Sequence, residues 1–68
     1  MSTIAKKLGQ NVRRLRGEKH MTQGEICRKM KSDRAYMSNL ESGKKNPTLE
    51  TLAKLAKALG VSMEELMK

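Results

Sequence analysis

Residues 22–43 have the sequence TQGEICRKMKSDRAYMSNLESG, which is typical of two short helices joined by a tight turn. Thr22 can cap the first helix through its hydroxyl. Glu25, three residues later, can bond back to the backbone N–H of Thr22 and complete a capping box. Gly43 is placed to end the second helix, because glycine adopts the left-handed conformation that a helix C-terminus often needs. The stretch therefore predicts a pair of helices with both outer ends defined.

The apolar pattern of this pair breaks at residues 31–33, between the two helices. Ser32 or Asp33 can cap the second helix. Met37 and Leu40 then face the interior from that helix at a spacing of three residues. Because two helices of this length bury too little apolar surface to be stable alone, they need the rest of the chain as a scaffold.

Three further helices are predicted by caps and apolar spacing. They are expected after a cap at Ser2 or Thr3 up to about residue 18, from the cap Thr48 to Gly60, and over about residues 63–67. The apolar stripes of the first two are Ile4, Leu8, Val12 and Leu15, and Leu49, Leu52, Leu55, Ala56 and Leu59. Val61, Ser62, Glu65 and Leu66 repeat the staple and capping-box pattern seen at Thr22. With no strand pattern, the fold class is all-α, with five helices in a single domain over residues 1–68.

Composition narrows the classes of function. The net charge of +8 lies entirely in residues 1–47, which hold 12 of the 15 Lys and Arg and 4 of the 7 Asp and Glu, whereas residues 48–68 are neutral. This division suggests one side that faces a polyanion and another side that packs. Basic charge alone leaves nucleic-acid binding open, because many small soluble domains are basic.

Several other classes are disfavoured by the sequence. No apolar run approaches the roughly 20 residues that span a bilayer, so we expect a cytoplasmic protein with no membrane partner. One Cys and one His supply neither a disulfide nor a zinc-ligand set, so no metal is expected. Without a phosphate-binding loop or a catalytic cluster, we expect no enzyme, no cofactor and no small-molecule ligand.

The second helix of the central pair carries side chains suited to reading base edges, namely Arg34, Ala35, Ser38 and Asn39. Arginine can bond guanine at two positions, asparagine can do the same for adenine, and alanine can touch the thymine methyl. Asp33 could accept a hydrogen bond from cytosine, although helix capping is the more common role of such a residue. Tyr36 is the only aromatic residue, which argues against stacking of single-stranded bases. Duplex DNA read through the major groove is therefore favoured.

The whole chain, after its first few residues, resembles the Cro and phage-repressor type of helix-turn-helix DNA-binding domain, the XRE family. The matching residues are Thr22-Gln23, Glu25-Ile26, Lys29-Met30, Arg34, Tyr36-Met37-Ser38, Leu40-Glu41, Gly43-Lys44, residues 46–52 and residues 56–62. The resemblance implies a compact five-helix repressor-like domain whose second and third helices form the helix-turn-helix, at about residues 22–43.

The resemblance also implies roles for individual residues. Base reading falls to Arg34, Ala35, Ser38 and Asn39. Phosphate and backbone contacts fall to Gln23, Arg28, Tyr36, Lys44, Lys45 and Asn46. Arg16 and Glu41 match a partly buried ion pair between the first and third helices. For each polar residue the alternative is an ordinary solvated side chain.

The implied function is a sequence-specific regulator of transcription, a dimeric repressor or autoregulator that binds a two-fold symmetric operator in double-stranded DNA. Such dimers read half-sites roughly 34 Å apart. The expected surface of the homodimer is Val61, Met63, Leu66 and Met67; alternatively, these residues only close the monomer core. The competing class is a protein-interaction module, antitoxin-like or an adaptor, with secondary DNA binding. Phage regulators and restriction–modification controllers share this layout, and the sequence does not identify the operator.

The sequence departs from the family pattern at the turn of the helix pair. Lys31 stands where the family usually has glycine, and Ser32 stands where it usually has an apolar residue. A lysine in the left-handed region costs roughly 1 kcal/mol. We therefore expect a turn that is longer, looser or differently shaped, with a small gap beneath it.

Overall fold

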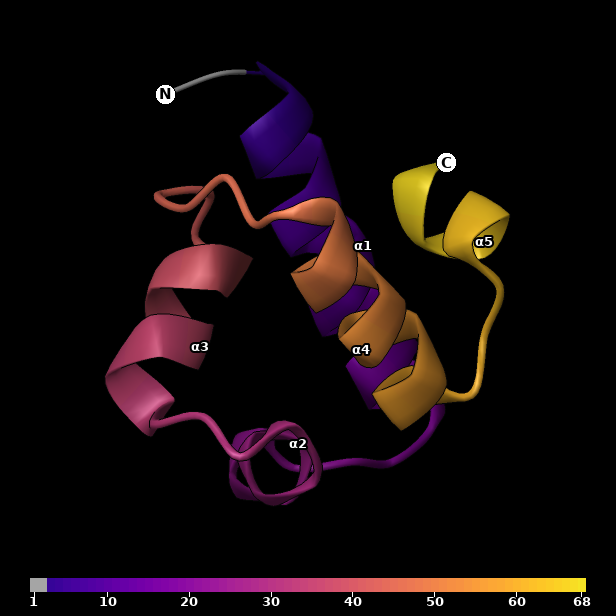
Figure 1. The fold of residues 1–68 in the computed structure, drawn as a ribbon. Coiled ribbons are helices and arrows are strands. Elements are labelled where there is room, and N and C mark those ends of the chain that lie inside the picture. The colour runs from indigo at the N-terminus through magenta and orange to yellow at the C-terminus, as the bar shows by residue number, and fades with distance from the viewer. Residues whose placement is uncertain (1–2) are drawn as a thin grey trace.

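Five helices make up residues 3–68, the part of the chain that this computed structural model describes. They are α1 (Thr3–Glu18), α2 (Gln23–Met30), α3 (Arg34–Glu41), α4 (Leu49–Leu59) and α5 (Met63–Met67). The all-α prediction and the order of the five helices are confirmed. Of the two expected caps of the first helix, Ser2 lies outside the described residues. Figure 1 shows α3 and α5 on opposite sides of the layer formed by α1 and α4, with α2 across one end.

Every helix contributes a fully buried apolar side chain to one core. Val12, Ile26, Met37, Leu55 and Leu66 come from α1 to α5 in that order, and all have zero exposure. Burial of such a side chain stabilises the fold by about 1.5–3 kcal/mol. The core therefore closes only when all five helices are in place.

Two residues of the predicted apolar stripes lie outside this core. Ile4 is 69% exposed on the first turn of α1, and Leu49 is 77% exposed at the start of α4. The prediction that both face the interior is wrong, because each stripe begins beyond the helices that cover its later residues. None of the helices in residues 3–68 is both long and apolar enough to cross a membrane.

Contacts of α1 with its neighbours depend on two residues of the helix interior. A Cβ atom at Gly9 would lie 2.5 Å from the carbonyl oxygen of Leu40 and 2.6 Å from that of Glu41. The absence of a side chain at Gly9 is thus what lets α1 approach the end of α3. On the side of α1 that faces α5, the buried side-chain amide of Asn11 donates a 2.9 Å hydrogen bond to the carbonyl of Leu66.

Three of the four connections between helices end in the same three-residue form, and we call these residues the three-residue junctions; in the first connection Lys19 precedes the junction. They are His20-Met21-Thr22, Lys31-Ser32-Asp33 and Gly60-Val61-Ser62. The first residue of each is left-handed, with φ of 55°, 57° and 71°. Its N–H bonds the carbonyl three residues back, and the N–H of the second residue bonds the carbonyl five residues back. These paired bonds satisfy the last carbonyls of the preceding helix.

The third residue of each junction caps the next helix through its side chain. Thr22, Asp33 and Ser62 accept hydrogen bonds from the backbone N–H three residues later. Thr22 belongs to a complete capping box, whose return bond runs from its own N–H to Glu25 at 2.8 Å. At Ser62, only half of the expected second box is present among the described residues, namely the bond from the N–H of Glu65 to the Ser62 hydroxyl at 3.1 Å. The carboxylate of Glu65 lies 3.5 Å from the Nζ of Lys68.

The turn between α2 and α3 therefore corrects our expectation of a longer or differently shaped connection. Lys31 adopts the left-handed conformation itself, with φ 57° and ψ 41°, and the turn keeps the form of the other two junctions. Asp33, and not Ser32, is the cap. The hydroxyl of Ser32 is buried without a hydrogen-bond partner. Beside it lies a hollow of about 270 Å³ lined by Met30, Ser32, Tyr36, Thr51 and Lys54.

Candidate nucleic-acid interface

One face of α3 is turned away from the core and carries the predicted base-reading residues. Met37 and Leu40 are fully buried on the inner side of the helix. Arg34, Ala35 and Ser38 are exposed on the outer side, and Asn39 is half-buried. The helical period of 3.6 residues places these four side chains within one arc of the surface. The carboxylate of Asp33 accepts the N–H of Tyr36 at 2.7 Å, so it serves as the cap of α3.

An ion pair fixes the far end of α3 against α1. The Nε of Arg16 lies 2.8 Å from one carboxylate oxygen of Glu41, and the Nη2 lies 3.1 Å from the other. The third guanidinium nitrogen donates to the carbonyl of Met21 at 3.0 Å. Both side chains are largely buried, and the hydrogen bond to Glu41 is the main cause of the raised pKa of Arg16. This two-pronged geometry is the strongest form of an arginine–carboxylate contact.

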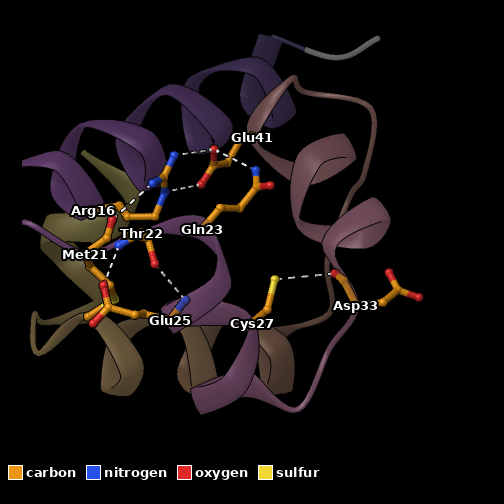
Figure 2. A network of polar contacts seen from close by, with 8 residues as sticks. All are labelled: Arg16, Met21, Thr22, Gln23, Glu25, Cys27, Asp33 and Glu41. Carbon is orange, nitrogen blue, oxygen red and sulfur yellow. Dashed lines mark hydrogen bonds and ion pairs between the residues drawn. The ribbon is translucent and has the colours of Figure 1, made fainter.

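Gln23, the first residue of α2, joins the same network. Its side-chain amide donates to Glu41 at 3.4 Å, so the start of α2 is tied to the end of α3 (Figure 2). On the other side of the helix pair, the thiol of the buried Cys27 donates to the carbonyl of Asp33 at 3.6 Å. Side-chain bonds thus connect α2 to both ends of α3, which limits how α3 can be reoriented.

The first turn of α2 carries the capping box of Thr22 and Glu25. The pKa of Glu25 lies below its ordinary value of 4.5, chiefly because the backbone N–H of Thr22 and then its side chain bond the carboxylate. The positive charges of Arg28 and Lys29 act in the same direction. The remaining N–H groups of a first helical turn have no partner inside their helix, which makes such a terminus suited to an anion.

Two arginines converge on Gly24, a feature that the sequence analysis did not find. A Cβ atom at Gly24 would lie 3.5 Å from the Nη2 of Arg34 and 3.7 Å from the Nη1 of Arg28. The guanidinium groups of α2 and α3 therefore share the space above this residue. The sequence signal was the glycine within a helix, but only the tertiary structure shows which side chains use the space it leaves.

The loop between α3 and α4 holds the expected basic backbone-contacting residues. Lys44, Lys45 and Asn46 are all exposed. The ammonium group of Lys45 lies over the ring of the half-buried Tyr36, 5.8 Å from its centroid. This contact places the basic loop beside α3, so that both belong to one continuous surface.

The predicted dimer surface divides into buried and exposed residues. Leu66 has zero exposure and belongs to the core of its own chain, and Val61 packs against that core. Met63 and Met67 are exposed by 37% and 44%. Together with Ile4, Met67 lines an apolar hollow of about 210 Å³ between α1 and α5. Within residues 3–68 no group of three or more potential metal ligands comes together.

Comparisons with known proteins agree with this architecture. A family model described as helix-turn-helix matches residues 12–66. The HTH-type transcriptional regulator y4dJ of Sinorhizobium fredii is 48% identical over 64 residues, which are 94% of this chain and 83% of that protein.

Two solved controller proteins of restriction–modification systems have similar structures. C.AhdI from Aeromonas hydrophila has a TM-score of 0.86 at 35% identity, covering 91% of this chain and 94% of that one. C.Esp1396I, solved as a tetramer in complex with its natural 35 base-pair operator, has a TM-score of 0.84 at 30% identity, with both chains fully covered.

Proposed function

The chain belongs to the helix-turn-helix family, and from that membership we propose that it is a sequence-specific, duplex DNA-binding regulator of transcription. The observation that carries the proposal is the outer face of α3, which is exposed and polar while its inner face is locked into the core. In this proposal α3 enters the major groove. Arg34, Ala35, Ser38 and Asn39 then meet base edges.

Contacts to the DNA backbone set the register of α3 in the groove. We assign them to Gln23 and the N-terminus of α2, to Arg28, to Tyr36, and to the loop residues Lys44, Lys45 and Asn46. Helix N-termini and basic side chains both bind phosphate, and such contacts position a protein without selecting sequence. Arg28 and Arg34 approach each other above Gly24, and two neighbouring guanidinium groups suit one phosphate. We therefore assign this pair a shared phosphate contact, in addition to base reading by Arg34.

The network of Arg16, Gln23 and Glu41 supports specific reading by holding α2 and α3 in a fixed relation. A misplaced recognition helix would lose several base contacts together, so a rigid connection favours discrimination over affinity alone. A loose turn at residues 31–33 would favour the competing assignment, an interaction module. Because that turn is regular and bonded at both ends, the DNA-reading assignment is preferred.

We propose that the protein acts in the cytoplasm as a homodimer, through Met63, Met67 and the neighbouring Ile4 and Val61. A two-fold dimer would place two copies of α3 on half-sites roughly 34 Å apart, and would repress by occupying a promoter. The operator-bound assembly of C.Esp1396I supports this arrangement. The family is one of DNA-binding regulators, and we assign the chain binding and no catalytic step.

The test is selection of bound duplexes from a random pool by the wild type and by Arg34→Ala. A two-fold symmetric motif is expected for the wild type, and loss of preference at one base pair of each half-site for the variant, at about 1–3 kcal/mol per pair. Arg14→Ala is the matched control, since Arg14 is exposed on α1 and pairs with Glu18. Recovery of no motif by either protein, with only salt-dependent binding, would overturn the proposal.

A further inference from the structure

A basic groove lies between the end of α2 and the outer side of α4. Its volume is about 650 Å³, and it is lined by Lys29, Met30, Lys31, Lys54, Lys57 and Ala58. The four lysines are exposed, whereas Met30 and Ala58 are half-buried and pack against the core. The groove thus has an apolar base and a rim of one charge.

The charge of this rim is poorly balanced by the protein itself. Lys54 lies 3.8 Å from the carboxylate of Glu50, and both side chains are highly exposed. Lys29, Lys31 and Lys57 make no ion pair within residues 3–68, although the charge of Lys29 contributes to the lowered pKa of Glu25. Like charges gathered around one concave surface favour an anionic ligand.

Lys31 occupies its place on the rim at a conformational cost. Its φ of 57° lies in the left-handed region, where glycine would carry no penalty. Gly60 fills the same position of the junction between α4 and α5. His20 is left-handed as well, with φ 55°, at the same position of its own junction, so this conformation belongs to the form of the turn. What Lys31 adds to the groove is an exposed positive charge on its rim.

None of the six lining residues belongs to the DNA contacts assigned above. The groove continues into the hollow at Ser32, because Met30 and Lys54 line both, and that hollow ends against Tyr36 of α3. A ligand in the groove would therefore lie next to the DNA-binding helices. The apolar base would suit a side chain such as leucine, to which the flexible Met30 can adapt.

We propose that this groove binds an acidic, amphipathic segment of a partner protein. Carboxylates of the segment meet the lysine rim, and an apolar side chain of the segment rests on Met30 and Ala58. The interaction would bring the partner to the site at which the regulator is bound on DNA. The inference goes beyond the proposed function and does not depend on base reading.

The test uses a labelled amphipathic peptide of about 16 residues, long enough for roughly four helical turns, with leucines on one face and glutamates beside them. A scrambled peptide of the same composition is its control. Binding is measured by fluorescence anisotropy without DNA at about 0.15 M salt, where distant charges are screened. The amphipathic peptide is expected to bind at least about tenfold more tightly than the scrambled one, since only it joins the charges to an apolar face.

Two sets of variants locate the binding site. Lys54→Gln with Lys57→Gln is expected to weaken peptide binding about tenfold. Arg13→Gln with Lys19→Gln, which removes two exposed charges from the α1 region, should change it less than about twofold. Lys31→Gly should weaken binding about threefold while raising the melting temperature by roughly 4 °C, so that misfolding cannot explain the loss.

Three kinds of result would overturn the proposal. The first is a failure of specificity, seen either as equal binding of the two peptides or as equal peptide binding by the groove pair and the α1 pair of variants. The second is a larger loss of affinity for duplex DNA in the groove pair than in the α1 pair, which would make these lysines phosphate contacts. The third is dissociation of the dimer in the groove pair, seen by sedimentation, which would assign the groove to a second copy of the chain.

Discussion

The junction between α2 and α3 follows the same backbone path as the junction between α4 and α5, but it is built from different residues. In the α4–α5 junction, Gly60 is left-handed and Val61 packs against the core. In the α2–α3 junction, Lys31 is left-handed and the hydroxyl of Ser32 is buried without a partner. Each ends in a side-chain cap, Asp33 or Ser62.

The difference shows that helix ends and caps define the path, and that glycine only lowers its cost. The bonds back to the preceding helix are present in both junctions with N···O distances of 3.0–3.3 Å. A lysine and a serine can therefore occupy the central turn of the DNA-binding unit at a cost of a few kcal/mol at most. The four predictions below test this comparison.

The largest effect on stability is expected at the ion pair of Arg16 and Glu41, which holds the end of α3 against α1. Arg16→Met leaves the carboxylate of Glu41, whose side chain is only 7% exposed, without its ionic partner. We expect a loss of about 3 kcal/mol in the free energy of unfolding, measured with urea. The double variant Arg16→Met with Glu41→Leu should recover most of it, because no buried charge is then left unpaired. A loss below about 1 kcal/mol in the single variant would contradict the assignment.

The middle residues of the two junctions should respond in opposite directions. Ser32→Val removes a buried hydroxyl without a partner and adds methyl groups next to a hollow, so we expect a gain of about 1–2 kcal/mol. Val61→Ser introduces a hydroxyl against the core and should lose a similar amount. Urea unfolding of both variants checks this, and two changes of the same sign would show that the junctions are not equivalent.

Exchange of the left-handed residues should give a smaller effect. Lys31→Gly relieves the strain and is expected to stabilise the fold by about 1 kcal/mol, whereas Gly60→Lys should destabilise it by about the same amount. A Cβ at Gly60 would meet no atom within 4 Å, so the second change tests conformation without a clash. Thermal unfolding provides the measurement. An unchanged melting temperature in both variants would refute a conformational cost.

The smallest effect concerns the remaining three-residue junction, His20-Met21-Thr22, which alone carries a complete capping box. Bonds from Thr22 lower the pKa of Glu25 in the folded state below 4.5. Its contribution to stability is therefore present above about pH 4.5 and is lost as the pH falls through the lowered pKa. The urea midpoint of the wild type should fall more steeply below pH 4.5 than that of Glu25→Gln. Equal slopes would show that the carboxylate is bonded no better in the folded chain than in the unfolded one.

The helix boundaries and the family were predictable from the sequence because their signals are local. Thr22, Thr48 and Ser62 bond to N–H groups three residues away, so the spacing of residues alone reveals them. Spacing left the cap of α3 open between Ser32 and Asp33, and the structure assigns it to Asp33. The ion pair of Arg16 and Glu41 was predictable only through the family resemblance, since its partners lie 25 residues apart. The outer face of α3 followed from helical periodicity once Met37 and Leu40 were placed in the core.

What the sequence determined by itself is thus the order and ends of the helices and, apart from Ile4 and Leu49, their inward faces, since a few neighbouring residues encode each of these properties. The tertiary structure decided which surfaces meet. It requires Gly9 where α1 approaches the carbonyls of α3, and it brings Arg28 and Arg34 together above Gly24. It also joins residues 29–31 to residues 54–58 around one groove. Periodicity shows which side of a helix is apolar, but which neighbour covers that side depends on the packing of all five helices at once.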